Sequence, residues 1–282
     1  MNTQKDTLYI IGNGFDLHHG LNTSYKNFRD NVVLKAPNLW KQLIDIYGDD
    51  VTKDMWWSDF EAKLADINYN HLLNSDNGVA MGGMKVQNFL TGQLPPLFGK
   101  WIKSINLNIV PENELDIDID ALFFTFNYSL VLEKIYKVNK DNIWHIHNSI
   151  EEVDKIIVGH DSDLNTLISN YNLNRGNKQY NSWIVDNIIP FAAEGAKDVE
   201  KRIADNMENF NKYSNIKHII SMGFSFNEID MPYIKAIISS NTNKKNIDWT
   251  IYYHQEGEDK TFINKLNSFK ICDEQINDPI RW

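Results

Sequence analysis

Short apolar runs, each ending in a polar or glycine-containing motif, alternate with segments of helical periodicity along this chain of 282 residues. We interpret as strands the residues 8–12, 121–126, 143–147, 155–159, 216–222 and 248–253. Strands that are this short and this apolar are typical of a parallel sheet that helices cover on both faces. The pattern therefore predicts an α/β fold with a doubly wound, mostly parallel sheet.

Helical spacing is predicted for residues 16–31, with an interruption at Gly20 and Asn22, and for residues 130–138 and 228–239. Trp57, Phe60, Leu64 and Ile67 also lie three or four residues apart, which places them on one face of a helix. Two mostly helical stretches, at about 32–113 and 161–213, interrupt the alternation of strands and helices. We therefore interpret residues 1–282 as a single α/β domain with two helical insertions.

Charge and composition exclude several classes of protein. The 28 basic and 38 acidic residues give a formal net charge of −10, which disfavours stable non-specific binding to DNA. Cys272 is the only cysteine, so an internal disulfide and a cysteine-cluster metal site are excluded. No apolar run approaches the roughly 20 residues of a membrane-spanning helix, and no secretory signal pattern begins the chain. We expect a cytoplasmic protein without membrane attachment.

A glycine-rich motif follows the first predicted strand and opens a helix. Glycine lets a backbone approach a phosphate, and a helix amino terminus offers N–H groups to an anion. The alternative is a strand-to-helix turn that needs glycine for its dihedral angles. The full dinucleotide motif is absent, because Leu17 stands where its third glycine would be. The residues of this candidate site are Gly12, Asn13, Gly14, Phe15 and Asp16.

Asparagine and histidine side chains follow the next strands. The amide of Asn127 can hold a ribose hydroxyl or a water, or it can cap a helix. His147 shares a strand face with His145 and fits a general base, because an unperturbed histidine has a pKa near 6.5. The alternative for both rings is structural hydrogen bonding. With His160 after the following strand, they also form a candidate zinc site.

The last motif, residues 223–230, follows a late strand and opens another helix. Ser225 can bind a phosphate through its hydroxyl and N–H groups, and Asp230 lies in the first turn of the helix, where it can cap or charge-stabilise it. A second glycine is missing, which disfavours the nucleophile elbow of a hydrolase. Since all four motifs follow the carboxyl ends of strands, we predict that they converge on one pocket.

These motifs, in this order, resemble the bacteriophage abortive-infection AbiH family. The chain departs from the family pattern at Asn148, where the family usually has Gly, and at Phe224, where it usually has His. The similar stretches are Ile10–Leu17, Gly20–Tyr25 with Phe28, Trp57–Glu61, Phe126–Ser129 with Glu133, His145–His147, Gly159–His160, and Gly223–Ser225 with Asp230–Tyr233.

The family is in turn similar to sirtuin-type NAD-binding domains, which implies a Rossmann-like or sirtuin-like sheet. Sirtuin-like defence enzymes use an Asn after the second strand and a His after the third, and these match Asn127 and His147. Ser129 stands in place of the Asp of the sirtuin Asn-x-Asp motif, and one cysteine cannot build the sirtuin zinc ribbon. The resemblance therefore implies cleavage of NAD rather than protein deacetylation.

Together, the residues and the resemblance predict an antiphage effector that binds and hydrolyses NAD or a related nucleotide without a metal. Two alternatives stay open: a non-catalytic nucleotide-sensing or protein-binding module, and a metal-dependent nuclease that uses His145, His147 and His160. A phage-derived trigger and a homo-oligomer also stay open. The predicted catalytic residues are Asn127, His147 and Asp16, and the predicted nucleotide-binding residues are Gly12, Asn13, Gly14, Phe15, Ser225, Asp230 and His160.

Overall fold

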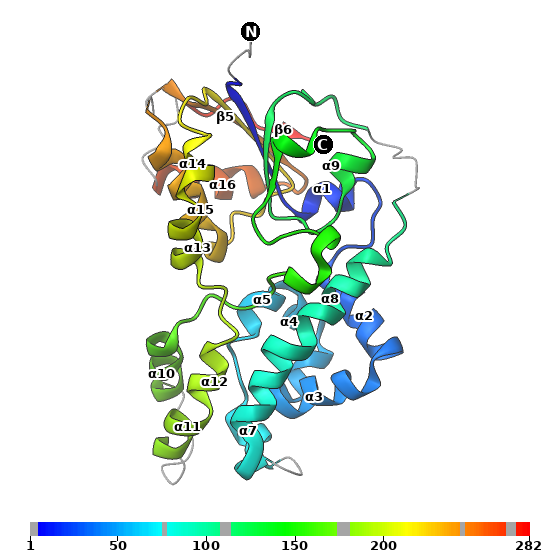
Figure 1. Cartoon of the computed structure of the whole chain (residues 1–282), viewed down its shortest axis with the longest axis vertical. Helices are drawn as coiled ribbons and strands as arrows, with labels where there is room; N and C mark the ends of the chain where they lie inside the picture. Colours follow the sequence, from blue (N-terminus) through cyan, green and yellow to red (C-terminus); the bar gives the residue numbers. More distant parts are fainter. Residues whose placement is uncertain (1–4, 75–77, 108–113, 174–180, 243–245, 269–274) are drawn as a thin grey trace. The chain divides into compact units, whose positions relative to one another are not determined.

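The computed structural model describes residues 5–74, 78–107, 114–173, 181–242, 246–268 and 275–282. The chain divides into two compact units, and Figure 1 labels their helices and strands. The α/β unit comprises Met1–Thr23, Ile102–Glu152 and Val199–Trp282. The helical unit comprises Ser24–Trp101 and Val153–Asp198, so that it is built from two insertions into the first unit.

The α/β unit contains a six-stranded parallel sheet with the strand order β3-β2-β1-β4-β5-β6. Its strands are β1 (Thr7–Ile11), β2 (Leu122–Thr125), β3 (Ile143–His145), β4 (His218–Met222), β5 (Asp248–Tyr253) and β6 (Ile280–Arg281). Its helices are α1 (Asn13–His18), α9 (Val131–Lys134), η3 (Lys140–Asn142), α13 (Val199–Asp205), α14 (Met207–Asn211), η6 (Glu228–Asp230), α15 (Met231–Ser240) and α16 (Glu258–Ser268). The predicted α/β fold with a parallel sheet is confirmed.

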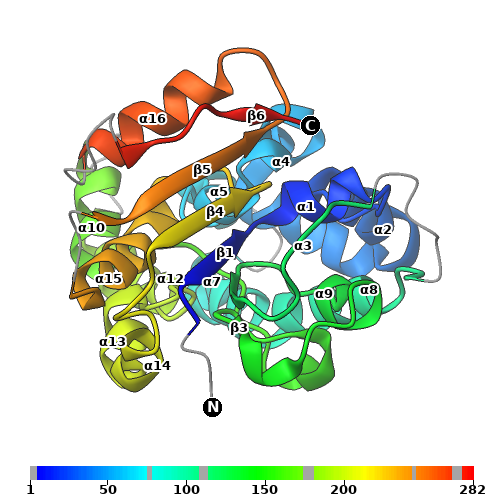
Figure 2. The ribbon, with the colours of Figure 1, turned by 90° about the horizontal axis from the view of Figure 1, so that it is seen from above.

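Side chains on successive strand positions face opposite layers of this unit. Leu8 and Ile10 of β1 belong to a core that α14, α15 and α16 cover, whereas Tyr9 and Ile11 belong to a second core with α1 and α9. Figure 2 shows β1, β4, β5 and β6 side by side between these helices. The strand order reverses at β1 and β4, which is where doubly wound sheets bind their ligands.

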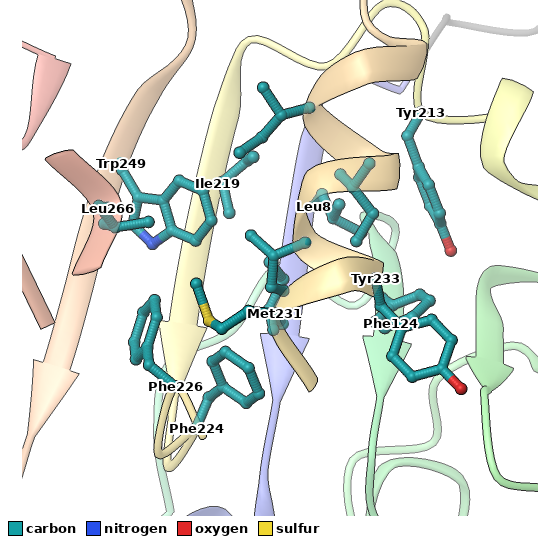
Figure 3. Packing of buried hydrophobic residues seen from close by; sticks show 14 of the residues in the cluster. Leu8, Phe124, Tyr213, Ile219, Phe224, Phe226, Met231, Tyr233, Trp249 and Leu266 are labelled. Carbon is teal, nitrogen blue, oxygen red and sulfur yellow. The ribbon is translucent and has the colours of Figure 1, made fainter. Parts of the chain in front are cut away.

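The first core is rich in aromatic side chains. Figure 3 shows Trp249 of β5 beside Leu266 of α16, and Phe224 and Phe226 beside Met231. Trp249 is fully buried, and its indole N–H donates to the Ser221 hydroxyl at 3.1 Å, which satisfies the polar atom of a buried tryptophan. The carboxyl end of β4 is therefore anchored from one face of the sheet.

The helical unit begins after α1 and contains no strand among its described residues. Its first segment forms α2 (Tyr25–Lys35), α3 (Pro37–Tyr47), η1 (Gly48–Thr52), α4 (Asp54–Ser58), α5 (Phe60–Lys63), α6 (Tyr69–Asn74), α7 (Gly78–Gln87), a π-helical turn η2 (Asn88–Gln93) and α8 (Leu94–Lys103), which ends in the other unit. The boundary of the second segment falls within η4 (Ile150–Lys155), and α10 (Leu164–Leu173), α11 (Asn181–Asn187) and α12 (Ile189–Ala193) follow.

One predicted strand is absent from the structure, and one predicted interruption of a helix is present. The predicted strand at residues 155–159 is wrong: Ile156 and Val158 are buried in alternation, but the segment pairs only through an isolated bridge between His160 and Ala196. Alternating burial against helices produced the same pattern as a strand. The interruption predicted within residues 16–31 is confirmed: α1 ends at His18 and α2 begins at Tyr25, and the chain turns between them at Gly20 with a φ of +73°.

Boundaries of the insertions also differ. The second predicted insertion reached residue 213, whereas α13 and α14 pack in the α/β unit and the helical unit ends at Asp198. The predicted helix with Trp57, Phe60, Leu64 and Ile67 is divided into α4 and α5, and Leu64 and Ile67 follow the end of α5. All four side chains are buried. Among the described residues, no helix has both the length and the apolar character that a membrane span requires.

Candidate active site

The turn after β1 packs directly against the turn after β4. The Gly14 N–H donates to the Gly223 carbonyl at 2.9 Å, and the Gly12 N–H donates to the Met222 carbonyl at 3.0 Å. A Cβ atom on Gly12 would lie 2.5 Å from the Gly223 oxygen, and one on Gly14 would lie 2.7 Å from the Gly223 Cα. The two glycines are therefore required by the close approach of two backbones.

These hydrogen bonds bear on the predicted phosphate cradle. The N–H groups of Gly12 and Gly14 are engaged with the β4 turn, and the Phe15 N–H donates to the Gly12 carbonyl at 3.0 Å. Helix α1 is only six residues long, so its dipole is small. The prediction that Gly12 and Gly14 hold a pyrophosphate gains no support from this geometry.

Asp16 and Asn127 meet at the carboxyl edge of the sheet. Helix α1 turns Asp16 inward, where it is 2% exposed, and Asn127, 6% exposed, follows β2. The Asn127 Nδ2 donates to the Asp16 Oδ1 at 2.8 Å, and the Asn127 N–H donates to the Thr125 hydroxyl at 3.0 Å. The structure thus brings together two of the three predicted catalytic residues.

Burial raises the pKa of Asp16 from 3.8 to about 6, because a carboxylate loses its hydration inside the protein. The neighbouring Ser129 hydroxyl, the hydrogen bond from Asn127 and the attraction of His145 lower this pKa but do not cancel the effect of burial, while Glu133 raises it further. A carboxyl group that titrates this close to neutral pH can both accept and release a proton.

His145 and Glu133 form a second, adjoining pair. The His145 Nδ1 lies 2.7 Å from the Asn127 carbonyl oxygen, and its Nε2 lies 2.9 Å from Glu133 Oε1. Their side chains are only 12% and 8% exposed. The sequence predicted His145 as a metal ligand or as a structural hydrogen-bonding residue, and it placed Glu133 in the AbiH motif without a chemical role. The adjacency of β2 and β3 could have indicated this site. It places His145, at the end of β3, beside the segment that follows β2.

His147, two residues after the end of β3, is surrounded by aromatic side chains. Its ring centroid is 5.8 Å from that of Phe126, 6.0 Å from that of Tyr128 and 5.9 Å from that of Tyr233. The Arg202 guanidinium from α13 donates to the neighbouring Ile146 carbonyl, a contact that the sequence did not reveal. The surroundings of His147 are thus mainly rings, and its predicted role as a base stays a prediction.

The turn after β4 presents Ser225 to solvent. Phe224 and Phe226, on either side of it, are buried, and Phe226 has a φ of +54°, which is unusual for a bulky residue. Phe224, where the family pattern has His, stacks on Phe126 with 4.8 Å between centroids. Asp230 is half-buried at the end of η6. The two aromatic anchors fix the position of Ser225.

Asn13 and Phe15, two further predicted site residues, lie in the first turn of α1. Asn13 is exposed, and its Nδ2 donates to the Thr23 carbonyl at 3.2 Å, whereas Phe15 is a core residue.

Asn148 has a φ of +62°, a left-handed conformation that glycine adopts freely and asparagine tolerates better than most residues. The departure from Gly at this position therefore preserves the turn.

His160, the remaining predicted ligand, belongs to the helical unit. Its Nε2 donates to the Ala192 carbonyl at 3.0 Å, and its Nδ1 accepts from the Ser162 N–H at 3.2 Å. Burial lowers the pKa of this ring, in agreement with a neutral imidazole. In the same unit Glu61 pairs with Lys197 at 2.8 Å. Among the residues that the structure describes, no group of three or more His, Cys, Asp or Glu side chains is arranged to hold a metal ion.

A comparison with protein families identifies the family of the chain. A model of the family described as bacteriophage abortive infection AbiH matches residues 8–253, from β1 to the end of β5. The chain belongs to the AbiH family. The AbiH match covers the helical unit, the α/β unit as far as β5, and every motif named above, and it gives the chain a role in bacteriophage abortive infection. A search of curated proteins finds no match.

Proposed function

We propose that this AbiH chain hydrolyses the N-glycosidic bond of NAD or a related nucleotide, with Asp16 and Asn127 as the reacting pair. The observation that carries the proposal is the buried Asp16 carboxyl, held by Asn127 at the carboxyl ends of β1 and β2, next to the point where the strand order reverses. Ligands of open α/β sheets bind at that point. A buried carboxyl whose pKa is raised to about 6 is typical of a catalytic acid or base.

The reaction balances with these two side chains. The bond between C1′ and the nicotinamide nitrogen breaks, and its electron pair stays with that nitrogen. Water forms the new C1′–O bond and gives its proton to the Asp16 carboxylate, which is mostly ionised above its pKa of about 6. Before that step, the negative charge stabilises the oxocarbenium-like centre at C1′.

Asn127 can position both Asp16 and the substrate, because its amide nitrogen and its amide oxygen are available for different hydrogen bonds. Its Nδ2 orients the Asp16 carboxylate, while its buried Oδ1 has no hydrogen-bond partner among the described residues. A buried acceptor left in this condition costs free energy until a donor arrives. A ribose hydroxyl or the attacking water would supply that donor.

The experiment is to incubate the purified chain with NAD and to measure nicotinamide release. We expect the Asp16→Asn variant to lose about 10²- to 10⁴-fold in rate, because the proton acceptor is gone. Asp120→Asn removes an exposed carboxylate from the same unit and is the matched control. Equal rates for Asp16→Asn and wild type contradict the proposal, and His147→Ala tests whether that ring is the base instead.

Infected cells provide the second arm, because an abortive-infection effector has to be silent before infection. We expect the NAD pool to fall after infection in cells with the wild type and to persist with Asp16→Asn. A nucleotide that is recovered intact from the wild type, together with an unchanged pool, indicates the non-catalytic sensor. For the nuclease alternative, His145 and His160 have both ring nitrogens bonded within the protein. The cytoplasmic location, the phage-derived trigger and the homo-oligomer stay predictions.

A further inference from the structure

His145 lies between two hydrogen-bond acceptors. A backbone carbonyl can only accept, so the His145 Nδ1, 2.7 Å from the Asn127 oxygen, must carry a proton. On the other side, Nε2 is 2.9 Å from Glu133 Oε1. If Glu133 is ionised, Nε2 must carry a proton as well, and the ring is an imidazolium.

The surrounding charges favour that distribution of protons. Besides Glu133 of α9, the carboxylates of Asp16 from α1 and Glu151 from η4 attract His145. The basic groups that also act on these carboxylates are Lys134 of α9 and Lys140 of η3, and Lys140 pairs with Glu151 at 2.5 Å. Two acceptors, one at each ring nitrogen, favour a ring that donates from both nitrogens.

We propose that Glu133 and His145 form a buried carboxylate–imidazolium pair that positions Asn127 through its backbone carbonyl and places a positive charge beside Asp16. Glu133 orients the ring, the ring holds the Asn127 main chain, and the Asn127 side chain holds Asp16. Both are positioning residues. The catalytic part of this inference rests on the proposed function, whereas the charge state of the pair does not.

Nuclear magnetic resonance of histidine-labelled (¹⁵N) full-length protein tests the charge state directly. The signals of His145 are identified by their loss in His145→Gln. At about pH 7.5, where an unperturbed histidine is mostly neutral, we expect both ring nitrogens of His145 to be protonated. A wild-type ring with one unprotonated nitrogen overturns the proposal.

The Glu133→Gln variant tests the partner. A glutamine amide can donate a hydrogen bond to Nε2, so the ring no longer needs its second proton, and we expect a neutral His145. Asp248→Asn is the matched control, because Asp248 pairs with His218 at 2.7 Å in an exposed counterpart of the same unit. A His145 that keeps both protons in Glu133→Gln contradicts the assignment of Glu133.

A readout at Asp16 separates positioning from mere packing. Since His145 acts more strongly than Glu133 on the Asp16 carboxyl, losing both charges should shift the carboxyl titration of Asp16 to higher pH, seen in its ¹³C signal. In an active enzyme the acid limb of the rate profile should move with it. A wild type that never cleaves NAD removes the proposed function, yet the spectra still decide whether the pair exists. An unmoved Asp16 titration overturns the proposed electrostatic effect.

Discussion

At the scale of single residues, Asp16 is a cost to the folded state at neutral pH. Its pKa is about 6 when folded and 3.8 as an ordinary aspartate, so the folded chain binds the proton more tightly. The contribution of this group to stability is therefore present below pH 3.8 and is lost as the pH rises to about 6. A residue kept under such a penalty is typical of functional sites.

We predict that Asp16→Asn raises the free energy of unfolding by about 3 kcal/mol at about pH 8 and hardly changes it at about pH 3.5. The amide keeps an acceptor for Asn127 without the charge. Urea unfolding at the two pH values measures the difference. Asp120→Asn, the exposed control, should change neither value by more than roughly 0.5 kcal/mol. Destabilisation by Asp16→Asn at the higher pH would contradict the conclusion that the buried charge of Asp16 destabilises the folded state.

Gly223 is the residue on which the packing of the two turns depends. Its φ is +62°, and a Cβ atom there would lie 2.0 Å from the Phe15 nitrogen. We predict that Gly223→Ala costs about 3 kcal/mol or more, since a backbone must move in addition to the left-handed strain. Thermal or urea unfolding measures the loss.

Gly257→Ala separates the two causes. Gly257 also has a positive φ, of +89°, but open space surrounds the position of its Cβ. This variant should cost only the left-handed strain of about 1–2 kcal/mol. Equal losses for both alanine variants would show that the close approach at Gly223 is unimportant.

At the scale of elements, the Glu61–Lys197 pair ties α5 to the segment after α12. The Lys197 side chain is fully buried and Glu61 is 12% exposed. We predict that Lys197→Met destabilises the protein by about 3–5 kcal/mol, because a buried carboxylate loses its lysine. Glu61→Leu combined with Lys197→Met should recover much of that loss. Calorimetry of the single and double variants checks both outcomes.

The exposed pair of Lys201 and Asp205, on the last turns of α13, offers the control. Those side chains are 66% and 56% exposed, so Lys201→Met should cost no more than about 1 kcal/mol. A similar loss for Lys201→Met and Lys197→Met would mean that burial of the pair contributes nothing. The sequence does not reveal this partner of Glu61, because Lys197 lies 136 positions further along the chain.

At the scale of the whole molecule, the formal net charge of −10 opposes association with nucleic acid. We predict no measurable binding to duplex DNA of arbitrary sequence at about 0.15 M salt and about 10 µM protein. Fluorescence anisotropy of a labelled duplex measures it. A salt-sensitive complex under these conditions would show that folding gathers basic side chains on one surface.

Periodicity and motif position along the chain determined the α/β class, the parallel sheet and the edge at which the polar motifs lie. Apolar residues at every second position, and short continuous apolar runs, indicate which side chains are buried. Parallel strands bring the residues that follow them to one edge of the sheet. Residues 155–159 show the limit of this reasoning, because burial against helices leaves the same alternation.

Tertiary structure alone decided which polar side chains meet. Asp16 and Asn127 are 111 positions apart, and His145 reaches Asn127 through a main-chain carbonyl that no side-chain pattern reveals. Glycine is needed after β1 because the backbone of Gly223 occupies the space that Cβ atoms would fill. Hydrogen bonds and close contacts depend on distances of a few ångströms between strands, and a one-dimensional pattern places a residue on an edge but does not choose its partner.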